Sequence, residues 1–135
     1  MACVPAELFA NDRPADPCDD THDGTGGNRC RAIIAPHASG WDQVAMGEWE
    51  LTAHGLGDCH PRDEVTYVLA GLVEIDCDGE RVTARPGDAV RVPAGRPAYY
   101  HAPDYARMLF IYGPNPEGRS AWTFQDRARV APPQR

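Results

Sequence analysis

The sequence predicts an all-β fold, because short β-rich runs follow one another between turn residues through most of the 135-residue chain. A second observation is the Asp-Gly pair of CDGE, residues 77–80, which is typical of a two-residue β-hairpin. The central part of the chain also lacks a convincing helical period. These observations favour a β-sandwich or barrel, and the length suits one domain.

The β-rich runs set the expected strands in chain order. Turns between them are supplied by Gly and Pro in ARPGD (84–88) and PAGRP (93–97). We expect the segment SAWTFQDRAR, residues 120–129, to form one helical turn or a last strand. The runs are RAIIA (31–35), GEWELTAH (47–54), EVTYVLAGLVEID (64–76), ERVTA (80–84), DAVRVP (88–93), PAYYHA (97–102) and ARMLFIYG (106–113).

Both ends of the chain differ in composition from this central part. Residues 11–30 are rich in Asp, Gly and Pro and have almost no apolar side chains, so they cannot bury enough surface to order themselves. We therefore expect a flexible N-terminal arm over residues 1–30, a barrel over 31–125 and a C-terminal tail over 126–135.

Charge and composition exclude several classes of partner. The net charge is −7 and the isoelectric point is about 5.1, whereas nucleic-acid binding requires clustered positive charge. No run approaches the roughly 18–20 apolar residues of a membrane helix, and no basic region precedes an apolar one at the N-terminus. We expect no nucleic-acid or membrane partner and a cytoplasmic location.

The cysteines favour reduced thiols over a disulfide framework. Their number is odd, and no two of them form a CxxC pair. Disulfides are rare in the cytosol, so we expect none to be needed for stability. The five residues are Cys3, Cys18, Cys30, Cys59 and Cys77.

Two stretches resemble the signatures of the cupin superfamily. In CHPRDEVTYVLAG, residues 59–71, His60 is followed after three residues by Glu64 and after six more by a glycine. In PGDAVRVPAG, residues 86–95, a glycine is followed after five residues by Pro-x-Gly. Within the superfamily, residues 45–115 are most similar to the ethanolamine-utilisation Q type. The resemblance implies a single-domain, cupin-type jelly-roll β-barrel whose mouth holds the ligand, and it implies a homodimer.

The chain departs from the metal-binding cupin pattern at two positions. Such a cupin usually has a histidine two residues before His60, where this chain has Asp58. It has another histidine at the position of Ala98, whose methyl group cannot ligate. Asp58 keeps an oxygen ligand on the same strand face as His60, because alternate residues share a face. The pattern still favours a divalent metal (iron, nickel, manganese or zinc) at Asp58, His60 and Glu64.

His60 and Glu64 can share one ion only if the chain folds back between them. On a straight strand, at roughly 3.3 Å per residue, they would lie about 13 Å apart, whereas metal–ligand bonds are near 2 Å. Pro61 lacks an amide donor, which favours a break in the ladder. We predict a bulge at residues 61–63. The alternative is a structural Glu64 that accepts a hydrogen bond from a barrel arginine such as Arg107.

His101 is a further candidate ligand, as a replacement for the histidine missing at Ala98. On a regular strand it has the opposite parity to Ala98, so Tyr100 would point inward instead. A register shift after Pro97 would reverse this order and bring His101 to the site. Without such a shift, His101 is a histidine on the rim.

Three classes of function remain open from the sequence. The first is a metal-dependent enzyme in which Asp58, His60, Glu64 and His101 hold the ion and a small polar substrate undergoes oxygenation, elimination or isomerisation. The second is a metal-free dehydratase, isomerase or cyclase with His60 as general base and Glu64 or Tyr100 as acid. The third is a ligand-binding cupin without turnover.

Overall fold

The structure, a computed structural model, describes residues 6–11, 16–17, 27–125 and 127. The described residues contain no α-helix, and therefore no helix that could cross a membrane. Their strands are β1 (Asp16–Pro17), β2 (Asn28–Ile34), β3 (Ala45–Cys59), β4 (Glu64–Gly71), β5 (Val73–Cys77), β6 (Glu80–Ala84), β7 (Ala89–Val92), β8 (Ala98–Tyr112) and β9 (Trp122–Phe124).

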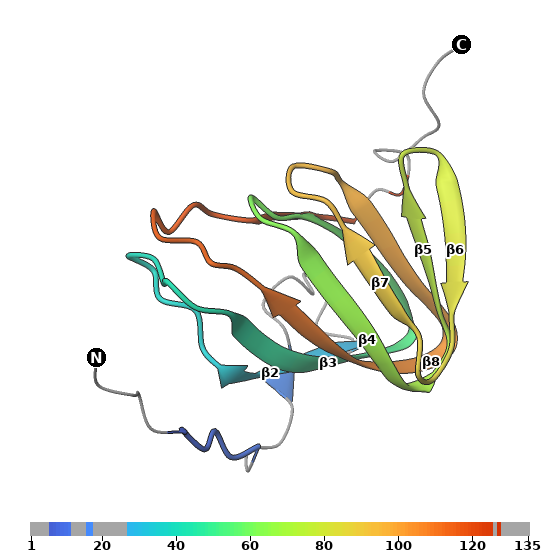
Figure 1. Ribbon diagram of the computed structural model, residues 1–135. Helices are drawn as coiled ribbons and strands as arrows, with labels where there is room; N and C mark the ends of the chain where they lie inside the picture. The colour runs from blue at the N-terminus through green and yellow to red at the C-terminus, as the bar shows by residue number, and fades with distance from the viewer. Residues whose placement is uncertain (1–5, 12–15, 18–26, 126, 128–135) are drawn as a thin grey trace.

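The strands form one curved antiparallel sheet with the order β1-β2-β3-β8-β4-β7. The β5–β6 hairpin pairs with β8, and β9 pairs with β3. Figure 1 shows the hairpin standing beside the first half of β8, while β4 lies along its second half. The predicted all-β, jelly-roll fold is confirmed, although the hydrogen-bonded order ends at edge strands rather than closing into a ring.

The long strand β8 runs through both halves of the barrel and turns at one corner (Figure 1). β5 pairs with β8 over residues 98–101, β4 pairs with it over residues 106–112, and β3 follows nearly its full length. Pro103, which has no amide N–H, lies between these two parts of β8, and the register of β3 shifts at Ala53. A proline and a bulge are typical of a barrel corner.

Strand alternation separates the barrel interior from the outer face. Along β8 five even-numbered residues point inward and are fully buried, and Asp104 at the corner is exposed. The five are Ala98, Tyr100, Ala102, Ala106 and Met108. Burial of these apolar side chains is the main contribution to folding, at roughly 25 cal/mol for each Å². The largest of the fully buried apolar side chains are Tyr100, Leu51, Ile75, Met108, Val68 and Val73.

The observed strands differ from the predicted runs in where they begin and in how they connect. The two runs at 97–102 and 106–113 form a single strand, β8, because Pro103 bends the strand without ending it. β2 begins at Asn28, three residues before the predicted run, and pairs with β1. The Asp-Gly hairpin is confirmed, with Asp78 and Gly79 at positive φ between β5 and β6. Segment 120–129 contributes β9, and most of the predicted arm and tail lie outside the described residues.

The interpretation of the cysteines as uniformly reduced thiols is wrong for Cys30. Cys30 is disulfide-bonded, and its partner lies outside the described residues. Cys59 and Cys77 are free. An odd number of cysteines leaves one unpaired but does not prevent two others from pairing, so the count alone was too weak a basis for the expectation.

Candidate metal centre

The ends of β3 and β4 carry the candidate ligands to one place. Asp58, near the end of β3, lies opposite Ala98 at the start of β8. Glu64, the first residue of β4, lies opposite Tyr112 at the end of β8. Because β8 turns at the barrel corner, residues from its two ends meet inside the barrel. The ligand-type atoms of Asp58, His60 and Glu64 all lie within 4.8 Å of one another.

The chain folds back between His60 and Glu64 through a bend rather than through the predicted bulge. β3 ends at Cys59, β4 begins at Glu64, and residues 60–63 connect the two strands. A bulge would have kept one continuous strand, whereas the chain here passes from one strand pairing to another. The predicted consequence, the return of Glu64 to His60, is nevertheless observed.

Two hydrogen bonds hold this bend against the PAGRP turn. The amide of Gly95 donates to the carbonyl oxygen of His60 at 2.8 Å. The amide of Ala94 donates to Oδ1 of Asp63, also at 2.8 Å. The two stretches that resemble cupin signatures are therefore adjacent in space, and the second fixes the backbone of the first.

The imidazole of His60 lies between two carboxylates. Its Nε2 atom is 2.8 Å from Oε2 of Glu64 and 3.1 Å from Oδ2 of Asp58. The side chain of Glu64 is 5% exposed, and those of Asp58 and His60 are 15% and 16% exposed. The cluster is thus largely buried but has access to solvent through Asp58 and His60.

The two carboxylates determine the protonation of His60. Burial by itself lowers the pKa of His60, because it disfavours the charged ring. Hydrogen bonds to Asp58 and Glu64, together with their negative charges, outweigh burial and raise the pKa to about 10. In the absence of a metal the ring is therefore an imidazolium at neutral pH, and the cluster holds a proton at its centre.

Tyr100 fixes the orientation of Glu64. It is fully buried, and its hydroxyl donates to Oε1 of Glu64 at 3.0 Å, which leaves Oε2 for His60. Burial and the charge of Glu64 raise the pKa of Tyr100 well above its usual value, so it stays a neutral donor. The alternative role predicted for Glu64 was to accept a hydrogen bond from Arg107. That contact is not observed, because Nη2 of Arg107 lies 2.7 Å from Glu48 instead.

Sequence reasoning did not single out Tyr112 as part of the site. Its ring packs against the ring of His60 with centroids 4.8 Å apart. Tyr112 and Tyr100 are separated by an even number of residues on β8, so strand alternation places them on the same inward face. This alternation is the sequence feature that could have indicated Tyr112. Proximity to His60 depends on the turn of β8, which the local sequence does not reveal.

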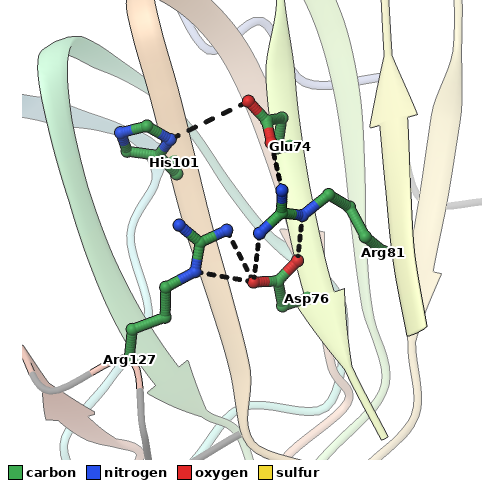
Figure 2. Close-up of polar contacts among 5 residues, drawn as sticks. All are labelled: Glu74, Asp76, Arg81, His101 and Arg127. Carbon is green, nitrogen blue, oxygen red and sulfur yellow. Dashed lines mark hydrogen bonds and ion pairs between the residues drawn. The ribbon is translucent and has the colours of Figure 1, made fainter. Parts of the chain in front are cut away.

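The structure does not bring His101 to this cluster. Tyr100 points inward, as regular alternation predicts, and His101 projects from the opposite face of β8. Figure 2 shows the ring of His101 turned toward Glu74 of β5, with Nδ1 3.9 Å from Oε1, beside the ion pairs that Asp76 makes with Arg81 and Arg127. The register shift after Pro97 that would have made His101 a ligand is absent from the pairing of β8 with β3.

Cys59 alternates with His60 and lies outside the cluster. Its side chain is buried, and burial followed by the charge of Asp58 raises the pKa of its thiol. A thiol that stays protonated is a poor nucleophile. Cys59 therefore packs as a small apolar residue.

The donor set fits a divalent metal. One imidazole nitrogen and two carboxylate oxygens converge, and these ligand types suit zinc, iron, nickel and manganese. Ala98 lies opposite Asp58, where the histidine of the usual pattern would supply a further ligand. With a methyl group there, three protein ligands would leave coordination positions open, as catalytic metal sites require.

Comparisons with known proteins agree with this architecture. The cupin domain family matches residues 48–112. Over 52 residues the chain is 36% identical to the acetate kinase EutQ of Clostridioides difficile (strain 630), a match that covers 38% of this chain and 33% of that protein. The chain thus matches one third of the length of this relative.

Solved structures show the same fold. The EutQ protein of Clostridium difficile superposes with a TM-score of 0.56 at 24% identity, covering 67% of this chain and 72% of that chain. The polyketide cyclase RemF from Streptomyces resistomycificus gives a TM-score of 0.67 at 20% identity, covering 92% and 89%. Residues 48–112 therefore match the cupin superfamily. Within that superfamily the sequence is similar to the EutQ type.

Proposed function

We propose that this cupin is a metal-dependent enzyme that acts on a small polar metabolite by oxygenation, elimination or isomerisation. The observation that supports this proposal is the convergence of Asp58, His60 and Glu64 within 4.8 Å, in a buried site with a solvent-accessible edge. A purely structural strand end has no need of two carboxylates around one imidazole. Such clusters of coupled titratable groups are typical of functional sites.

Each residue of the site has a distinct part in this proposal. Asp58, His60 and Glu64 would hold the ion, and Tyr100 would keep Glu64 in the orientation that the hydrogen bond defines. Tyr112 restricts the ring of His60 by packing against it. A metal bound there would supply a Lewis acid that polarises a substrate oxygen.

The metal-free enzyme is the second candidate, and the site changes the role of its central residue. A general base must be unprotonated at the working pH, but the pKa of His60 is raised to about 10. Without a metal, His60 would therefore donate a proton rather than accept one. The fold likeness to a polyketide cyclase supports an enzyme of either kind.

The proposal is tested by the metal content of protein purified without a histidine tag. We expect about one divalent ion per chain in the wild type and at least a hundredfold weaker binding in His60→Ala and Glu64→Gln, because each loses a direct ligand. The melting temperature of metal-free Glu64→Gln should stay within a few degrees, since the substitution also relieves repulsion between two carboxylates. Elemental analysis and thermal melts measure both quantities.

Glu50→Gln is the matched control. Glu50 lies on the outer face of β3, where it accepts a hydrogen bond from Tyr105, so its replacement should leave metal content unchanged. Metal-free wild-type protein with turnover would establish the second candidate, and metal-free protein that binds a ligand without turnover would establish a non-catalytic cupin. The homodimer, the small-molecule substrate and the lack of nucleic-acid and membrane partners remain predictions.

A further inference from the structure

An open cavity of about 580 Å³ adjoins the bend that carries the metal centre. Arg62 and Asp63 line it, and both belong to the connection between His60 and Glu64. Its wall also includes Gly113, which follows the tyrosine packed against His60. A ligand in this cavity would therefore contact the same short segment of chain that presents two of the three candidate ligands.

Among the partly buried arginines that the structure describes, Arg62 is the one without an ion pair to a carboxylate. Arg31 and Arg107 pair with Glu48, and Arg127 pairs with Asp76. Arg62 is only partly exposed, yet its Nε–H is shielded from water and has no hydrogen-bond partner among the residues that the structure describes. Nε of Arg31 is in the same state although Arg31 is paired, so the missing ion pair is what sets Arg62 apart. A guanidinium that lines a cavity without a carboxylate partner among the described residues can bind the carboxylate of a ligand.

The other charges of the cavity narrow the chemistry of that ligand. Asp63 uses Oδ1 to accept the amide of Ala94, and Asp42 adds a second carboxylate to the wall. A simple anion would meet one positive and two negative groups. A ligand that combines a carboxylate with a hydroxyl group would satisfy Arg62 through the carboxylate and donate to Asp42 through the hydroxyl.

We propose that Arg62 binds the carboxylate of a small hydroxycarboxylate in this cavity. The further statement that this ligand is the substrate rests on the proposed function, whereas the binding itself does not. Arg62 is then a specificity-determining residue, because its planar guanidinium matches a carboxylate in two parallel hydrogen bonds that an ammonium group cannot reproduce.

The test compares lactate with lactamide, its uncharged analogue, as probes in ligand-observed NMR titrations of metal-free protein. Wild-type protein should bind lactate at millimolar concentrations and lactamide at least about tenfold more weakly. Arg62→Ala should lose about tenfold or more in lactate affinity, and Arg62→Lys should retain part of it. Arg91→Ala, which removes a charge from an exposed position of β7, should bind lactate as the wild type does.

Equal lactate affinity in wild type and Arg62→Ala would overturn the inference, as would a wild type that fails to bind lactate or to prefer it over lactamide. Circular dichroism of Arg62→Ala and Arg62→Lys verifies that both are folded. Metal content separates this inference from the proposed function. A wild type that holds no metal but binds lactate through Arg62 would contradict the proposed function and support the carboxylate site.

Discussion

Glu48 and Glu64 are both buried glutamates on strands that flank β8, but their surroundings differ in charge. Each residue is 4% exposed. On the outer face, Glu48 is bound by the guanidinium groups of Arg31 and Arg107, so one carboxylate faces two permanent positive charges. Inside the barrel, Glu64 shares a single titratable cation, His60, with a second carboxylate, Asp58.

The sign of the excess charge distinguishes the two clusters. Burial raises the pKa of Glu48, but the hydrogen bonds and charges of its two arginines outweigh this effect, and the pKa is lowered. That cluster is complete with the residues of the chain alone. The inner cluster has two carboxylates for one imidazolium and so retains an excess of negative charge around a proton. A divalent cation in place of that proton would supply the missing charge, which a structural ion pair does not need.

The largest effect that this comparison predicts is a loss of stability when Glu48 is replaced. Glu48→Gln should lower the free energy of unfolding by about 2–3 kcal/mol, because two guanidinium groups lose the negative charge with which they pair at a buried position. Chemical denaturation of the metal-free protein measures the change. Metal content should not fall, since Glu48 lies on the face opposite the cluster.

Glu50→Gln again serves as the control for Glu48→Gln. Glu50 is on the same outer face of β3 but accepts a single hydrogen bond, from the hydroxyl of Tyr105 at 3.0 Å. Glu50→Gln should lower the free energy of unfolding by less than about 1 kcal/mol, the usual net contribution of one such hydrogen bond. If Glu48→Gln lost no more stability than Glu50→Gln, the contrast between a structural and a cation-binding glutamate would be wrong.

A smaller effect is expected between pH 7 and pH 8, and it concerns the inner cluster. The pKa of His60 is about 10 in the folded metal-free protein and near 6.5 when unfolded. The resulting stabilisation is fully present below about pH 6.5 and is lost as pH rises toward 10. Between pH 7 and pH 8 the unfolding free energy should fall by about 1 kcal/mol, because the folded state binds more protons.

Metal should abolish this pH dependence. A ligating imidazole is deprotonated, so metal binding at neutral pH should release about one proton per chain and tighten as pH rises. Melts of wild-type and His60→Ala protein, each with and without chelator, provide the test. A decline of the same slope in metal-free His60→Ala would assign the titration to another group.

The sequence predicted the strands and the residues of the cluster better than it predicted the geometry of the cluster. His60, Glu64 and the Pro-x-Gly turn were recognisable because their spacing is local, and Tyr100 followed from strand alternation. The bend at residues 60–63 was predicted as a bulge, because sequence spacing shows that the chain must return but not which strands it joins.

Contacts between distant strands were beyond the reach of such local reasoning. The assignment of Arg107 to Glu48 rather than to Glu64 depends on the register between β3 and β8. The position of Tyr112 beside His60 depends on the turn of β8 at Pro103. The disulfide of Cys30 also depends on a pairing that cysteine count and spacing do not determine.

The smallest effect is expected at His101, which tests where the inner cluster ends. His101 is a histidine near carboxylates like His60, but its one assigned carboxylate contact is Nδ1 to Oε1 of Glu74 at 3.9 Å, beyond hydrogen-bond distance. Its side chain is 32% exposed, twice the 16% of His60. Exposed and loosely paired charges contribute little to stability.

His101→Ala should therefore change the unfolding free energy by less than about 0.5 kcal/mol and leave metal content at the wild-type level. The matched comparison is His60→Ala, because both variants remove one imidazole, in one case from β8 and in the other from the residue that follows β3. Elemental analysis and denaturant titration of the two variants side by side give both quantities. Loss of metal in His101→Ala would mean that β8 shifts its register when an ion binds, and the three-ligand cluster would then have to be extended to the opposite face of the strand.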